Sequence, residues 1–253
     1  MTTATGALAL VVGSAYLGMG LLVLKDLVIQ RRARGWSHFG AAFVVMAFTC
    51  GPHHLAHGVH VVFEGHAVSV PMAGSLLLAL PAAVAFIGLR VERGFGGRGD
   101  RLIAGDPAWL SASVVIALVV SGGLLVLAAG WVAAHGFPVM ALPSIVLAVC
   151  YVVVGWCYLR TQTMRRGSTG GWSLSGVALG WIFPTCALMH LMLVASTPDV
   201  HLLVVDLAGM PGALYFLWAV SRLYRRALRD WSRTPVVGPV ARTPRPAPWS
   251  VAA

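Results

Sequence analysis

Seven cysteine and histidine side chains with regular spacing give the clearest chemical signal in the sequence. One apolar stretch holds five of them within eleven residues: Cys50, His53, His54, His57 and His60. A later apolar stretch holds Cys186 and His190, which repeat the four-residue spacing of Cys50 and His54. Residues four apart lie on one face of a helix, so each pair would present a thiol beside an imidazole. Together the two pairs predict a Cys2His2 site that suits zinc or copper.

Further ionisable side chains accompany these two pairs. His53, His57 and His60 are spaced by four and three residues, so they form a second stripe on the same helix, and Glu64 continues it. Asp206 is the only acid well inside the last apolar stretch. An ionisable residue inside a membrane is costly, and by default it indicates function. We expect the stripe and Asp206 to supply auxiliary metal ligands, or a path for a cation or for protons.

Two other interpretations of the same residues stay open. His54 and His190 alone would be the two axial ligands of a b-type haem, which would make the chain an electron-transfer protein. A buried histidine also forms hydrogen bonds between membrane helices, so the cluster fits a seven-helix receptor or a structural membrane protein as well. Catalysis, transport and sensing of a metal are all compatible with the first interpretation.

The elements that would position these residues are membrane helices. The chain has 253 residues, of which 58% are hydrophobic and only 10% are charged, and this composition is typical of an all-α integral membrane protein. About 20 apolar residues cross the hydrocarbon layer as a helix. Seven stretches are long enough, near residues 6–29, 38–62, 69–91, 109–133, 141–161, 173–197 and 201–224. We expect a multi-pass protein of the cell membrane.

The positive charges are distributed unevenly along this pattern. All 18 lysine and arginine residues fall in connectors or helix ends on one side of a seven-span arrangement. The positive-inside rule makes that side cytoplasmic, with the N-terminus outside and the C-terminus inside. The net charge of +10 is then a topology signal, and the expected partner is the lipid bilayer and not a nucleic acid. A homo-oligomer is compatible with the pattern. The proline- and arginine-rich residues 230–253 predict a disordered cytoplasmic tail.

The chain also contains two similar halves. The residues that recur at one constant offset are Gly35-Trp36-Ser37 with Gly171-Trp172-Ser173, Cys50 with Cys186, and His54 with His190. With one inserted residue the match extends back to Tyr16 and Tyr151, and after a shorter loop it continues at Pro81 with Pro211 and Phe86 with Phe216. We predict a 3+1+3 internal repeat within a membrane domain of residues 1–229. Halves near 6–91 and 141–226, joined by a linker helix at 109–133, would be related by a twofold axis along the membrane normal.

Two resemblances concern the seven-helix arrangement. Residues 181–184 (Trp-Ile-Phe-Pro) and 204–210 (Val-Val-Asp-Leu-Ala-Gly-Met) resemble stretches of the microbial rhodopsins, which implies a rhodopsin-like architecture. Met210 stands where those proteins carry the retinal lysine, and Lys25 is the only lysine, so no retinal chemistry is implied. The chain is also similar to seven-helix zinc hydrolases of the alkaline ceramidase and adiponectin-receptor type. However, Cys50 replaces their serine and the last stretch lacks their paired histidines, so hydrolase activity is not implied.

Overall fold

The computed structural model of the chain describes residues 2–65, 70–97, 99–136, 139–195 and 200–230. This part of the chain is almost entirely helical, and it contains seven helices long and apolar enough to cross a membrane. They are α1 (Thr2–Arg34), α2 (His38–Phe63), α3 (Val70–Gly94), α4 (Ala108–His135), α5 (Leu142–Thr169), α6 (Leu174–Ala195) and α7 (Val200–Asp230). The prediction of a seven-helix multi-pass membrane protein is confirmed at this level. Beyond Asp230, the tail predicted from the sequence lies outside the described residues.

Several helices are longer than the apolar stretches that predicted them. α1 and α5 continue through basic residues, because arginine is a good helix former once it has left the hydrocarbon. Each then ends at a glycine with positive φ, Gly35 at 76° and Gly170 at 74°. The N–H groups of these glycines bond back to the carbonyls of Arg31 and Arg166, four residues earlier. A left-handed glycine that closes the last turn in this way is a common helix end.

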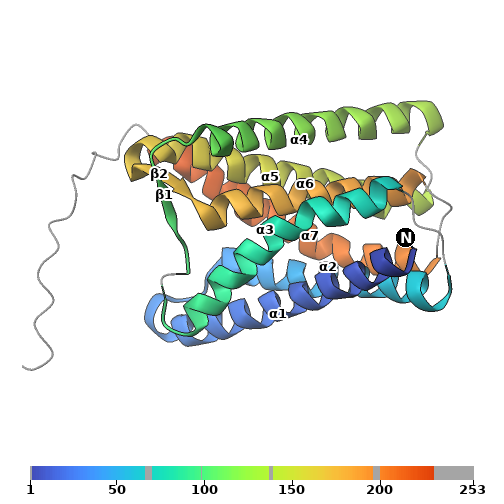
Figure 1. The fold of residues 1–253 in the computed structure, drawn as a ribbon, viewed down its shortest axis with the longest axis horizontal. Helices are drawn as coiled ribbons and strands as arrows, with labels where there is room; N and C mark the ends of the chain where they lie inside the picture. Colours follow the sequence, from blue (N-terminus) through green and yellow to red (C-terminus); the bar gives the residue numbers. More distant parts are fainter. Residues whose placement is uncertain (1, 66–69, 98, 137–138, 196–199, 231–253) are drawn as a thin grey trace, which may run out of the picture.

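The helices form two closely packed pairs with two helices that bridge them. α1 runs beside α2, and α5 runs beside α6 (Figure 1). α3 contacts both α1 and α6, and α7 contacts both α5 and α2. The core between them is rich in aromatic rings: Phe216 of α7 lies 6.1 Å from Phe43 of α2 and 5.3 Å from Phe183 of α6, measured between ring centroids. The bridging helices therefore hold the two pairs together around one interior.

α4 lies at the edge of the bundle, against α5 and α6 (Figure 1). One stripe of the helix is buried, including Leu110, Val114 and Ala117. The other side exposes large apolar side chains such as Val119 and Val126, which are 69% and 71% exposed. A long apolar face of this kind is typical of a surface that contacts lipid or another protein. The outer face of α4 therefore suits contact with lipid tails.

A short two-stranded sheet closes one end of the bundle, where the sequence analysis expected only connectors. β1 (Leu102–Ala104) pairs antiparallel with β2 (Gly171–Ser173), which directly precedes α6. Gly171 is needed at this point, because an added Cβ would lie 2.1 Å from the carbonyl oxygen of Ile103. The carboxylate of Asp100 accepts hydrogen bonds from the Ser173 hydroxyl at 2.6 Å and from the Ser175 N–H at 2.9 Å. The α3–α4 connector thus fixes the start of α6. A short 3-10 turn, η1 (Val139–Ala141), precedes α5.

Candidate metal centre

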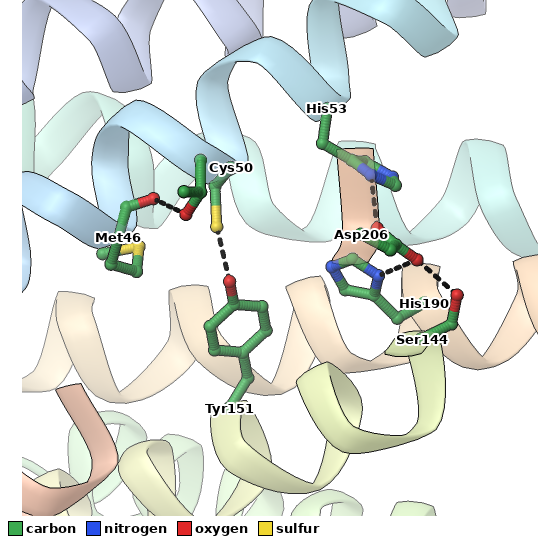
Figure 2. A network of polar contacts seen from close by, with 8 residues as sticks. Met46, Cys50, His53, Ser144, Tyr151, His190 and Asp206 are labelled. Carbon is green, nitrogen blue, oxygen red and sulfur yellow. Dashed lines mark hydrogen bonds and ion pairs between the residues drawn. The ribbon is translucent and has the colours of Figure 1, made fainter. Parts of the chain in front are cut away.

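Three side chains from three different helices meet in the interior. His53 comes from α2, His190 from α6 and Asp206 from α7, and Figure 2 shows the carboxylate of Asp206 between the two imidazole rings. Nδ1 of His53 lies 2.7 Å from Oδ1 of Asp206, and Nδ1 of His190 lies 3.4 Å from Oδ2. The three residues can each offer one ligand atom within 4.8 Å of the others. We call these residues the His53–His190–Asp206 group.

The group is sealed inside the protein. His53 and His190 are each 2% exposed and Asp206 is 1% exposed. The two imidazole rings also pack against each other, with centroids 4.7 Å apart. A fourth helix contributes through Ser144 of α5, whose hydroxyl donates a hydrogen bond to Oδ2 of Asp206 (Figure 2). An unpaired carboxylate would be very costly at such a place, and these three neighbours are what makes it tolerable.

Two nitrogen–oxygen separations in the group can be compared with those of a tetrahedral ion. Nitrogen and oxygen ligands lie about 2.0–2.1 Å from zinc, which puts two of them roughly 3.3 Å apart at the tetrahedral angle. The separation of His190 Nδ1 from Asp206 Oδ2 already has this value. The separation of His53 Nδ1 from Oδ1 is a hydrogen-bond distance, so these two atoms would move apart by about half an ångström on binding.

The two predicted thiol ligands have other partners. The Cys50 thiol forms a 2.8 Å hydrogen bond with the Tyr151 hydroxyl on α5, and the Cys186 thiol forms one of the same length with the Tyr16 hydroxyl on α1. Within the described part of the chain, neither cysteine belongs to the group whose ligand atoms gather within 4.8 Å. The structure therefore brings His53 of the predicted stripe and His190 of one predicted pair together with Asp206, and it places both cysteines beside tyrosines.

His54 points away from this group. Its ring stacks on Tyr16 with centroids 5.4 Å apart and planes inclined by only 10°. It is 3% exposed, and neither ring nitrogen has a hydrogen-bond partner among the described residues. The ring lines a small pocket together with Cys186 and Met189 of α6. His54 and His53 are neighbours in the chain, and a helix turns by about 100° per residue, which explains why they face different surroundings.

The remaining members of the predicted stripe lead from the group along α2. His57 is 6% exposed, one turn after His53. His60 follows, with Nε2 3.8 Å from the carboxylate of Glu64, whose side chain is 52% exposed. Burial therefore decreases along the stripe towards the end of α2. His60 does not belong to the His53–His190–Asp206 group. His57, His60 and Glu64 follow one another along α2 from the buried interior to the surface.

Ser144, Tyr16 and Tyr151 are polar contacts of the site that the sequence analysis did not assign. The two tyrosines did carry a signal, because they occupy matching positions in the two halves of the sequence. Ser144 carried none, since a serine near the start of an apolar helix is common. Comparisons with protein-family models, with curated proteins and with solved structures found no match for this chain. Its function is therefore inferred from the geometry of its own residues.

Proposed function

We propose that this protein is a multi-pass membrane protein that binds one divalent transition metal ion at His53, His190 and Asp206, and that this ion is zinc. The observation that carries the proposal is the convergence of two imidazoles and one carboxylate from three helices in a sealed interior. Two nitrogens and one oxygen form the ligand set of many open zinc sites, which keep a fourth position for water or a substrate. Copper, the other metal that the sequence suggested, accepts the same donors.

The direction from which the ion enters follows from the distribution of charge. The C-terminal ends of α1, α3, α5 and α7 lie at the end of the bundle where β1 and β2 pair (Figure 1). Their arginines make this end cytoplasmic by the positive-inside rule, so the N-terminus is outside and the C-terminus inside. α2 runs in the opposite direction, which puts His60 and Glu64 on the outer side. The stripe from Glu64 to His57 is the route by which a cation reaches His53 from outside.

An internal duplication is part of this proposal, because several contacts occur in matching pairs. The Tyr16–Cys186 bond corresponds to the Tyr151–Cys50 bond at the same 2.8 Å. The guanidinium of Arg31 lies 5.4 Å from the ring of Trp36, and that of Arg166 lies 5.4 Å from the ring of Trp172. The bridging contacts of α3 with α1 and α6 match those of α7 with α5 and α2. These pairs support two halves related by a twofold axis, with α4 as the linker helix.

A second candidate function is proton transfer along the same residues. The separation of 2.7 Å between His53 Nδ1 and Asp206 Oδ1 favours it, because the two atoms are close enough for a proton to pass between them. In that case His53 and Asp206 would share a proton, and the stripe on α2 would carry it to the surface. The b-type haem on His54 and His190 stays a prediction from the sequence alone. A Soret band in the purified protein would identify it.

Zinc binding by the purified protein in detergent tests the proposal. We expect one zinc ion per chain by elemental analysis and by competition with a chromophoric chelator. Asp206→Asn and His190→Ala should lose it, because each removes one of three ligands. His135→Ala is the matched control, since this exposed histidine at the end of α4 bonds only to the carbonyl of Trp131 among the described residues. Zinc should also raise the free energy of unfolding of the wild type, by about 2.7 kcal/mol when the free zinc concentration is 100 times the dissociation constant.

Three results separate the candidates. Zinc bound by the wild type and by His135→Ala, but not by Asp206→Asn, supports the proposed site. A folded wild type that takes up no zinc, copper or iron refutes metal binding and leaves proton transfer as the candidate. Zinc that is retained in both Asp206→Asn and His190→Ala refutes the assignment of the ligands. Thermal unfolding distinguishes a misfolded variant from one that has lost only the site. A folded variant without the site still unfolds cooperatively, but its melting temperature no longer rises when zinc is added.

A further inference from the structure

The surroundings of His54 correspond to those of His190, with two exchanged residues. The repeat pairs His54 with His190, and each ring lies beside a tyrosine that bonds to a cysteine. The offset that pairs Cys50 with Cys186 places Met189 opposite His53. The offset that pairs Pro81 with Pro211 places Leu76 opposite Asp206. A thioether and an isobutyl group therefore stand where the first group has an imidazole and a carboxylate.

These exchanged residues line a real pocket. His54, Leu76, Cys186 and Met189 all border it, and each is at most 5% exposed. The space open to the centre of a water molecule is only about 10 Å³, which is close to the least that holds a single water. This space is therefore sufficient for about one water-sized particle, such as a single ion. His54 borders it with two ring nitrogens that have no hydrogen-bond partner among the described residues, and a buried polar atom of this kind calls for a partner.

The donor atoms and the charge select the ion. Thiolate, thioether and imidazole are the ligands that soft Cu(I) prefers, and zinc sites do not normally use a thioether. Leu76 contributes no charge where the first group has Asp206. One thiolate therefore neutralises a monovalent ion completely, whereas a divalent ion would leave one uncompensated positive charge in an apolar interior, which is costly.

We infer that His54, Cys186 and Met189 form a second metal site, specific for Cu(I), beside the His53–His190–Asp206 group. The Cys186 thiol loses its proton when the Cu–S bond forms, so one proton is released for each ion that binds. The hydroxyl of Tyr16, already 2.8 Å from this sulfur, then donates its hydrogen bond to the thiolate and stabilises it. The inference does not depend on zinc binding, because the two sites share no ligand.

Titration of the reduced protein with Cu(I), buffered by bicinchoninate, tests this site. We expect one Cu(I) per wild-type chain, and X-ray absorption at the copper edge should show sulfur neighbours. Cys186→Ser and Met189→Leu should each weaken Cu(I) binding at least tenfold and leave zinc binding unchanged. Asp206→Asn should do the reverse. Matched controls are Cys150→Ser, a buried cysteine on α5, and Met192→Leu, one turn after Met189 on α6.

The possible results divide clearly. No uptake of Cu(I), a copper spectrum without sulfur neighbours, or unchanged affinity in Met189→Leu would overturn the inference. Loss of Cu(I) from Asp206→Asn would overturn it as well, because copper would then occupy the first group. Met189→Leu keeps the side-chain volume, so it remains informative if Cys186→Ser does not fold. Cu(I) that has sulfur neighbours and is kept by Asp206→Asn, in a chain that takes up no zinc, would support this site and refute zinc binding at the first group. Zinc binding without copper binding would do the opposite.

Discussion

Ser144→Ala tests whether the Ser144 hydroxyl supports the proposed zinc site through its hydrogen bond to Asp206. The Ser144 hydroxyl donates to Oδ2 of Asp206, the same oxygen that lies 3.4 Å from His190. A hydrogen bond to a charged acceptor contributes about 1.5–3 kcal/mol, and each 1.4 kcal/mol is a factor of ten in affinity. We therefore expect zinc affinity to fall roughly 10- to 100-fold, which is also the usual effect of removing a partner of a metal ligand. The stoichiometry should stay at one ion.

Ser121→Ala is the matched control for this change. Ser121 is fully buried on α4, and its hydroxyl bonds to the carbonyl of Ala117 in the same helix. Both substitutions remove one buried hydroxyl, but only Ser144 contacts the site. Competition with a chromophoric chelator at fixed pH measures the affinities, and thermal unfolding without metal measures stability separately. Equal zinc affinity in wild type and Ser144→Ala, or an equal loss in Ser121→Ala, would refute the reasoning.

Two further predictions concern packing and pH. Gly13→Ala places a Cβ 2.8 Å from the carbonyl oxygen of Gly51 on α2, so we expect the free energy of unfolding in detergent to fall by about 1–3 kcal/mol. Gly18→Ala is the control, because its Cβ meets nothing within 4 Å and should not destabilise the protein. Equal free energies of unfolding for the two variants would contradict this prediction. A hydrogen bond from Ser111 lowers the pKa of Asp106. The contribution of the ionised Asp106 to the stability of the fold is therefore complete above a pH of about 4, and it is lost as pH falls through the lowered pKa. In Asp106→Asn, the melting temperature should consequently fall less steeply as the pH is lowered below about 4. A dependence of melting temperature on pH equal to that of the wild type would exclude this role.

The sequence predicts the helices well, because the constraint is strong and local. About 20 apolar residues are needed for each span, and the stretches that meet this requirement, including α2 and α6, are helices in the structure. The β1–β2 pair was not predicted, since each strand has only three residues. It forms because Gly171 allows close approach to Ile103 and because Asp100 bonds to the start of α6. Contacts between distant connectors of this kind leave no periodic pattern.

The members of the site were predictable individually, but their combination was not. His53, His190 and Asp206 stand out because ionisable residues are rare in apolar helices. The four-residue spacing, however, paired His54 with Cys50 and suggested that His54 would face His190. Spacing fixes which residues share a face of one helix, but not how that helix is rotated against its neighbours. In the structure α2 is rotated so that His53 meets Asp206 at 2.7 Å, while His54 stacks on Tyr16.

A carboxylate is present beside His53 and His190 but not beside His54, and this difference has a physical reason. The His53–His190–Asp206 group and the pocket at His54 share α2 and α6, because His53 and His54 are consecutive, as are Met189 and His190. A second aspartate at Leu76 would bring another charge into the same apolar interior. Among the residues that line this pocket, His54 is the only side chain that could carry a compensating positive charge, and uncompensated charges there are costly. Asp206 is accepted because His53, His190 and Ser144 all bond or pair with it. The two proposed sites follow this difference: a divalent ion suits the group that holds a carboxylate, and a monovalent ion suits the residues around His54, which offer sulfur ligands and no carboxylate.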